Sequence, residues 1–147
     1  MKYYLAYGSN LNKEQMAHRC PDAEAVGASV IFDYQLVFRR GYLTIEPKIG
    51  ASVPVGIWKI SEADERNLDR YEGYPRFYFK MDDFHVCMNG QDILCMAYIM
   101  QAGYPIQEPS DAYMQTVRDG YRDFGFKIAP LIIAGIEAHV NSRRGEE

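Results

Sequence analysis

The chain has 147 residues, of which 48% are hydrophobic and 24% are charged, and its formal net charge at pH 7 is −4. These values are typical of a globular protein and exclude a disordered or collagen-like chain. The negative net charge argues against nucleic acid as the main partner. A chain of this length is expected to fold as one domain that buries about two thirds of its unfolded surface.

Three cysteines show neither the spacing of a metal site nor that of a redox motif, and their odd number does not fit a disulfide framework: Cys20, Cys87 and Cys95. We expect them to be reduced and structural. The N-terminal residues carry no cleavage signature, and no apolar stretch approaches the ~20 residues that a membrane span needs. The sequence therefore predicts a soluble cytoplasmic protein.

The short apolar run Lys2–Tyr7 predicts a buried strand, because it is rich in aromatic residues and stops at Gly8. A turn, Tyr7–Leu11, follows. Gly8 can adopt backbone angles that are closed to other residues, and Ser9 and Asn10 readily form side-chain-to-backbone turns. Several N–H groups can therefore converge on an anion here. The alternative is that the turn only connects the strand to a helix.

A helix is expected after Asn12, whose side chain can cap it, and Pro21 ends it. Two strands are predicted next, at Ala25–Phe32 and Tyr34–Phe38, and another at Val55–Ile60, from their β-branched and aromatic content.

The stretch Arg39–Val53 contains three residues that commonly interrupt strands, Gly41, Pro47 and Gly50. We predict an irregular excursion with a short strand at Tyr42–Ile45, which forms part of a pocket wall.

The segment Ser61–Asp64 has the pattern of a capping box, with acids in the first turn that complement the helix dipole. It predicts a helix that runs to about Tyr71 and is ended by Gly73 and Pro75. A hairpin then follows, in which Phe77–Met88 and Ile93–Met100 flank an Asn-Gly turn at residues 89 and 90.

Two helices are predicted in the C-terminal third. The first begins near Ser110 or Asp111, and its apolar stripe consists of Tyr113, Val117, Tyr121 and Phe124. The second begins at Pro130. The domain is predicted to end near residue 140, before a polar, frayed tail at Asn141–Glu147.

This order of elements predicts a single α+β domain with a mainly antiparallel, barrel-like mixed sheet and flanking helices. It is not a run of regular βαβ units, which argues against a dinucleotide-binding fold.

Glu72 is the candidate acid–base group. The chain has 12 tyrosines, and three of them lie close to this glutamate in sequence: Tyr71, Tyr74 and Tyr78. A glutamate packed among tyrosine rings is partly desolvated, which raises its pKa toward neutrality and suits a general base. The alternative is a solvated carboxylate at a helix end, paired with Arg70 or Arg76.

Other candidate groups have weaker support. Ser9 lacks the Gly-x-Ser-x-Gly elbow of serine hydrolases. Of the adjacent Arg39 and Arg40, at most one can reach an acidic substrate, because neighbouring side chains in a strand point to opposite faces. The three histidines show neither triad nor metal-ligand spacing: His18, His85 and His139.

Several of these segments resemble the gamma-glutamylcyclotransferase family. Lys2–Leu11 and Leu68–Gly73 resemble its N-terminal turn and its Glu-Gly element, and Val55–Ile60 resembles its Gly-x-x-Trp strand. Cys95–Met100, followed by Pro109–Tyr113, is similar to its last strand and the entry to the next helix. Together the segments span about residues 2 to 125, and their order and spacing are more specific than any one of them.

The resemblance implies roles for particular residues. The family's turn contributes to substrate binding, which implies that role for Tyr7–Leu11, and its single acid is the proton acceptor, which corresponds to Glu72. The tyrosine after Pro-Ser-x-x touches substrate, which corresponds to Tyr113, and Tyr78 stands where the family often has a pocket tyrosine. The resemblance also implies a compact barrel, with no metal and no organic cofactor.

The reaction implied by the resemblance is intramolecular. The α-amine of a γ-glutamyl amide attacks the γ-carbonyl and closes a five-membered lactam, which releases 5-oxoproline and a free amine. Glu72 would take a proton from the α-ammonium and return it to the leaving amine. The sequence leaves open whether Tyr7–Leu11 holds a substrate carboxylate or the oxyanion.

The leaving group also stays open, because the stretch Gly41–Val53 does not align with the family pattern. Related enzymes release amino acids, alkylamines, isopeptide lysines, antibiotic side chains or, in a longer and less similar branch, cysteinylglycine from glutathione. Two other functions remain as alternatives: a non-catalytic small-molecule binding module on the same fold, and hydrolysis or aminoacyl transfer with an external nucleophile. The oligomeric state, including a homodimer, is not readable from one sequence.

Overall fold

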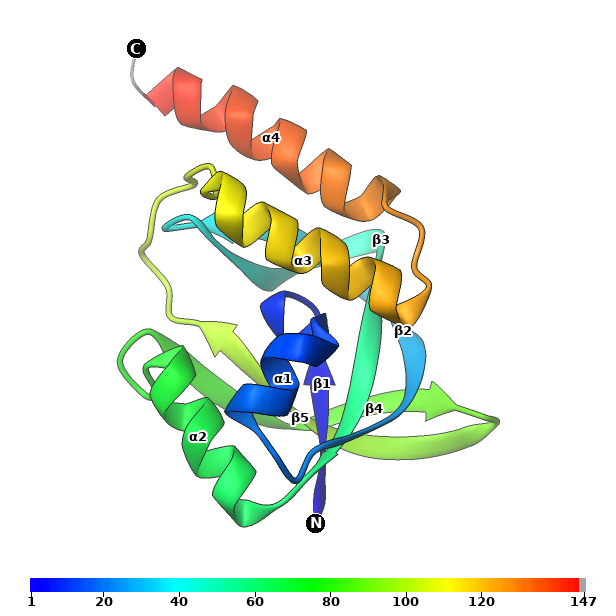
Figure 1. The fold of residues 1–147 in the computed structure, drawn as a ribbon. Helices are drawn as coiled ribbons and strands as arrows, with labels where there is room; N and C mark the ends of the chain where they lie inside the picture. The colour runs from blue at the N-terminus through cyan, green and yellow to red at the C-terminus, as the bar shows by residue number, and fades with distance from the viewer. Residues whose placement is uncertain (146–147) are drawn as a thin grey trace.

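A five-stranded mixed sheet forms the centre of the protein in a computed structural model, which describes residues 1–145 (Figure 1). Its strands lie in the spatial order β2-β3-β1-β5-β4. In chain order they are β1 (Lys2–Ala6), β2 (Glu24–Arg39), β3 (Tyr42–Ile60), β4 (Tyr78–Met88) and β5 (Gln91–Met100). β1 pairs in parallel with β5, and the other neighbouring strands are antiparallel. The predicted α+β class with a mainly antiparallel mixed sheet is confirmed.

The sheet curls until its two edge strands meet, which gives the barrel-like shape that was predicted. The Ser29 hydroxyl on β2 donates a hydrogen bond to the carbonyl of Cys87 on β4 (2.6 Å). Further along the same edges the rings of Tyr34 and Phe84 pack with their centroids 5.3 Å apart. These contacts cover edges that would otherwise expose unpaired backbone groups.

The prediction of two separate strands at Ala25–Phe32 and Tyr34–Phe38 is wrong, because β2 is continuous. Its register with β3 shifts between Phe32 and Tyr34, and Asp33 adopts a positive φ of 64° at the shift. The break in the sequence pattern therefore marks a β-bulge within one strand.

The prediction of an irregular excursion over Arg39–Val53 is also wrong, because β3 starts at Tyr42 and pairs with β2 along this stretch. β1 pairs with residues 56–60 of β3, so the first half of β3 lies beyond the end of β1. Pro47 is tolerated because a proline can occupy a strand edge that faces no further strand. Gly50 lies in the short unpaired interval between the partners of Tyr34 and Phe32.

The helices are η1 (Ser9–Leu11), a short 3₁₀ turn, followed by α1 (Lys13–Arg19), α2 (Glu62–Glu72), α3 (Asp111–Phe124) and α4 (Ala129–Gly145). The predicted caps are confirmed. Asn12 accepts from the N–H of Gln15, Ser61 and Asp64 form a reciprocal capping box, and Ser110 caps α3.

The helices α3 and α4 lie together at the top of the view in Figure 1, and α2 lies apart from them at the lower left. α4 includes the first part of the predicted polar tail, and residues 146–147 of that tail lie outside the described residues. Among the helices of residues 1–145, none is long and apolar enough to cross a membrane.

Two glycines allow α3 and β3 to pack closely on the turn that follows β1. A Cβ added at Gly120 of α3 would lie 2.7 Å from the Cβ of Leu11 and 2.8 Å from the backbone nitrogen of Asn12. A Cβ at Gly56 of β3 would lie 2.8 Å from Cδ2 of Leu11. Leu11 is fully buried. The turn is therefore packed against the core through Leu11, and its other residues are free to line a cavity.

Candidate active site

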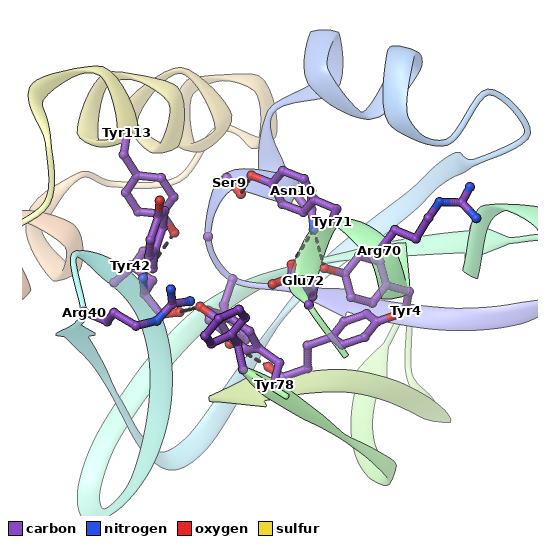
Figure 2. Close-up of a pocket in the computed structure, with 16 residues that line it drawn as sticks. Tyr4, Ser9, Asn10, Arg40, Tyr42, Arg70, Tyr71, Glu72, Tyr78 and Tyr113 are labelled. Carbon is purple, nitrogen blue, oxygen red and sulfur yellow. Dashed lines mark hydrogen bonds between the residues drawn. The ribbon is translucent and has the colours of Figure 1, made fainter. Parts of the chain in front are cut away.

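A cavity of about 350 Å³ lies between the turn after β1, the end of α2, the tip of the β2–β3 hairpin and the start of α3 (Figure 2). Its volume is in the range of small-molecule sites, roughly 300–1,000 Å³. Its charged lining residues are Glu72, Arg40 and Arg70. Tyrosines make up much of the rest: Tyr4, Tyr7, Tyr42, Tyr71, Tyr78, Tyr98 and Tyr113. Polar groups thus converge in a largely aromatic pocket.

The turn after β1 is held by its own backbone and by a tryptophan. The N–H groups of Leu11 and Asn12 donate to the carbonyls of Gly8 and Ser9, both at 3.0 Å. Nε1 of Trp58 donates to the carbonyl of Asn10 (2.9 Å). The first N–H groups of such a turn have no partner within it, so they are available to an anion.

Glu72 is the last residue of α2, which Gly73 ends in the left-handed conformation (φ 66°). Its Oε1 accepts a hydrogen bond from Nδ2 of Asn10 (3.1 Å). The same nitrogen donates to the Tyr4 hydroxyl (2.8 Å), and Oδ1 of Asn10 accepts from the guanidinium of Arg19. Asn10 therefore connects the N-terminal turn directly to the carboxylate, as Figure 2 shows.

Burial raises the pKa of Glu72 to about 7, against the opposing effects of the nearby Arg19 charge, the Asn10 hydrogen bond and the Arg40 charge. The alternative pairing with Arg70 or Arg76 is not seen. The Arg70 guanidinium bonds the side chain of Asn67, and that of Arg76 lies 5.2 Å from the centre of the Phe77 ring. Glu72 is a desolvated carboxylate that titrates near neutral pH.

Three tyrosine hydroxyls have defined hydrogen-bond directions at the site. Tyr7 donates to the carbonyl of Tyr98 (2.6 Å), and Tyr78 donates to the carbonyl of Leu43 (3.0 Å). The Tyr113 hydroxyl instead accepts from the N–H of Leu43 (3.2 Å). Burial raises the pKa of Tyr78 and of Tyr113 above the ordinary range, so both hydroxyls stay neutral. Tyr113 therefore keeps its proton for a ligand, whereas Tyr7 and Tyr78 offer lone pairs.

The structure gathers most of the predicted site residues around one cavity: Tyr7, Gly8, Ser9, Asn10, Glu72, Tyr78 and Tyr113. The side chain of Leu11 faces the core instead. Within residues 1–145, no group of three or more His, Cys, Asp or Glu side chains is placed to hold a metal ion.

Sequence reasoning missed several lining residues, among them Tyr4, Tyr42 and Tyr98. Of the two adjacent arginines, Arg40 lines the cavity, and Arg39 lies in an ion pair with Glu46. The glycine at residue 41 follows Arg40 between the predicted strands Tyr34–Phe38 and Tyr42–Ile45. This short gap could have indicated a hairpin turn at residues 40 and 41.

A single half-buried carboxylate in a tyrosine-lined cavity, on a barrel-like α+β domain, defines a small-molecule site with one titratable acid. Residues 4–120 match the family model described as gamma-glutamyl cyclotransferase, AIG2-like, and the chain belongs to this family.

Known proteins resemble the chain over most of its length. The human gamma-glutamylcyclotransferase is 27% identical over 137 residues, which cover 85% of this chain and 72% of that protein. The gamma-glutamylcyclotransferase of Bos taurus has the same identity and coverage. A solved structure named gamma-glutamyl cyclotransferase superposes with a TM-score of 0.76 at 26% identity, covering 87% of this chain and 82% of that chain. These relatives support an enzyme of this type.

Proposed function

We propose that this protein converts a γ-glutamyl amide of an amino acid or amine into 5-oxoproline and the free amine, with Glu72 as general acid–base. One observation carries the proposal. The only carboxylate that lines the cavity within residues 1–145 is half-buried among tyrosines, has its pKa raised to about 7 by desolvation, and is hydrogen-bonded to Asn10 of the N-terminal turn.

The reaction begins with a proton transfer from the α-ammonium of the substrate to the Glu72 carboxylate. The free α-amine attacks the γ-carbonyl, and a new C–N bond closes the five-membered ring. The old amide C–N bond then breaks while Glu72 passes its proton to the leaving nitrogen. The ring nitrogen, which still carries two hydrogens after the attack, gives up one of them to Glu72, and this second proton leaves with the released amine as an ammonium ion. No water is consumed, and one residue serves each proton transfer.

The raised pKa makes the first transfer easier. An α-amino group has a pKa of about 8, so proton transfer to a carboxylate with the ordinary glutamate pKa of 4.5 would be strongly unfavourable. Raising the pKa to about 7 removes roughly 3 kcal/mol of that difference, at about 1.4 kcal/mol per pKa unit. The burial that makes Glu72 a stronger base is therefore also part of its catalytic role.

The other polar groups complement this chemistry. The N–H groups of the turn at Gly8–Asn10 suit a substrate carboxylate or the oxyanion that develops on the γ-carbonyl. Tyr113 donates its hydroxyl proton to the same region. Tyr7 and Tyr78 present lone pairs, which suit an ammonium or amide N–H. These contacts fold the substrate so that its amine faces its own γ-carbonyl.

A panel of γ-glutamyl amides tests the proposal. We expect 5-oxoproline by mass spectrometry from at least one amide of an amino acid or amine. Glutamate in its place would indicate hydrolysis by an external nucleophile. Binding without any product would favour a non-catalytic binding module.

The pH profile gives a second test. Glu72 must be ionised to accept the α-ammonium proton, so activity is present above its pKa and is lost as the pH falls through it. We expect kcat/KM to decrease about tenfold per pH unit below a midpoint of about 7. A decrease in activity centred near pH 4.5, the ordinary pKa of glutamate, would contradict a desolvated Glu72 as the base.

A further inference from the structure

Arg40 occupies a backbone conformation that its residue type disfavours. Together with Gly41 it forms the two-residue turn of the β2–β3 hairpin, where Arg39 pairs with Tyr42. The φ angles of Arg40 and Gly41 are 56° and 80°. Turns of this kind need positive φ at both central residues and favour Asn-Gly, whereas arginine rarely adopts positive φ. Such an outlier beside a cavity points to a functional reason for the side chain.

The side chain of Arg40 lies in an aromatic enclosure. Its guanidinium carbon is 4.2 Å from the centre of the Phe77 ring, 5.1 Å from that of Tyr42 and 5.3 Å from that of Tyr104. Stacking on rings fixes the plane of the guanidinium and leaves its edge free for hydrogen bonds.

The guanidinium has hydrogen-bonding capacity to spare. Nε of Arg40 is buried and has no hydrogen-bond partner within residues 1–145. A buried N–H of a charged group without a partner is costly, so an acceptor is expected to fill the position. The neighbouring Arg39 shows the contrast, because its guanidinium already bonds Glu46 and the carbonyl of Tyr104.

We propose that Arg40 binds the carboxylate of the leaving amino acid, so that the enzyme selects γ-glutamyl amino acids over γ-glutamyl amides of simple amines. This inference rests on the proposed function. A planar guanidinium edge matches a carboxylate, which can accept two parallel N–H hydrogen bonds.

The position of Arg40 favours the leaving group over the other carboxylate of the substrate. The α-carboxylate is attached to the carbon that carries the α-amine, so it stays near Glu72 when that amine is deprotonated. Figure 2 shows Glu72 beside Asn10, with Arg40 across the cavity on the side of Tyr42. The amide nitrogen stays within reach of Glu72, from which it receives a proton, but its substituent extends away from the attacking amine, toward this second side.

Two substrates of equal size isolate the carboxylate: γ-glutamyl-alanine and γ-glutamyl-alaninamide. We expect the wild type to prefer the first by about 10- to 100-fold in kcat/KM, which is the range of a hydrogen bond to a charged group. Arg40→Asn removes the guanidinium and keeps a residue suited to the turn. It should remove the preference, so that kcat/KM becomes nearly equal for the two substrates, at an unchanged or higher Tm. Arg76→Gln is the matched control, because Arg76 faces the same Phe77 ring but is exposed and does not line the cavity.

Three results would overturn the inference: a wild type without preference, equal losses on both substrates in Arg40→Asn at unchanged Tm, or equal losses with a lowered Tm. The second would assign Arg40 to the shared α-carboxylate, and the third would make it structural. If the wild type turns over neither substrate, the proposed function fails, and calorimetric binding to Glu72→Gln decides the inference separately. Tighter binding of γ-glutamyl-alanine that is lost on adding Arg40→Asn supports the carboxylate site, and equal binding of both compounds contradicts it.

Discussion

Replacement of Glu72 by glutamine should abolish 5-oxoproline formation while the fold and ligand binding persist. Glutamine keeps the size of the side chain and can still contact Asn10, whose amide can pair with either residue. It cannot accept the α-ammonium proton. The loss in kcat should therefore be at least the 10²–10⁴-fold that general acid–base catalysis typically contributes. Steady-state kinetics and calorimetric affinity for γ-glutamyl-alanine measure the two quantities separately.

The same substitution has a stability signature that depends on pH. The pKa of Glu72 is raised in the folded protein from 4.5 to about 7, so the folded state binds this proton more tightly than the unfolded state does. The wild type therefore loses stability as the pH rises from 4.5 to 7, and Glu72→Gln does not. The difference in free energy of unfolding should shift in favour of the variant by about 3 kcal/mol across this interval. Urea unfolding at pH 5 and pH 8 measures the shift.

A glutamate on the same helix provides the control. Glu62 lies in the first turn of α2 and is exposed, away from the cavity. Glu62→Gln should retain full activity and show no comparable change in stability between pH 5 and pH 8. Full activity in Glu72→Gln would reject Glu72 as the acid–base residue, and a pH-independent stability difference would reject its raised pKa.

Local signals were sufficient to predict the two halves of the site. The Gly8–Asn10 turn follows directly from its residue types. The capping box at Ser61 predicts where α2 starts, and Gly73 predicts where it ends. The hydrogen bond between Asn10 and Glu72 could not be predicted from local signals, because it joins residues 62 positions apart in sequence. It depends on how β1 and α2 pack in three dimensions.

The missed features share one physical cause. Pro47 and Gly50 interrupt strands when judged locally, but this part of β3 lies beyond the end of β1, where the missing hydrogen bonds have little cost. Recognising the long hairpin requires the register of β2 against β3, and that register places Arg40 at the cavity. The sequence marked Arg39 and Arg40 as candidates of which at most one reaches an acidic substrate, and only the strand pairing shows that it is Arg40 that lies at the cavity.

Gly120→Ala should damage both stability and activity, although alanine is a better helix former than glycine. Its Cβ would lie 2.7 Å from the Cβ of Leu11 and 2.8 Å from the backbone nitrogen of Asn12. Neither backbone can yield without moving α3 away from the turn. Overpacking of this kind costs about 1–3 kcal/mol, which exceeds the gain of up to about 1 kcal/mol in helix propensity.

The effect on activity follows from the same displacement. Asn10 precedes Leu11 in the turn, lines the cavity and bonds Glu72 over 3.1 Å, so a shift of the turn moves the groups at Gly8–Asn10 away from the base. A misplacement of about 1 Å can cost 10²-fold in rate. We expect a decrease of that order in kcat/KM even for the folded fraction of Gly120→Ala, measured with γ-glutamyl-alanine below the unfolding transition.

Gly135→Ala is the matched control, because it makes the same change on the neighbouring helix α4. The nearest atom to its added Cβ is Cε of Met114, at 3.1 Å, the end of a flexible side chain that can move aside. This variant should be as stable as the wild type or more stable, by up to about 1 kcal/mol from helix propensity, and fully active. Equal stability and activity of the two alanine variants would show that α3 does not position the turn. A selective loss in Gly120→Ala would show that the site depends on close backbone packing beneath it as well as on the residues that line it.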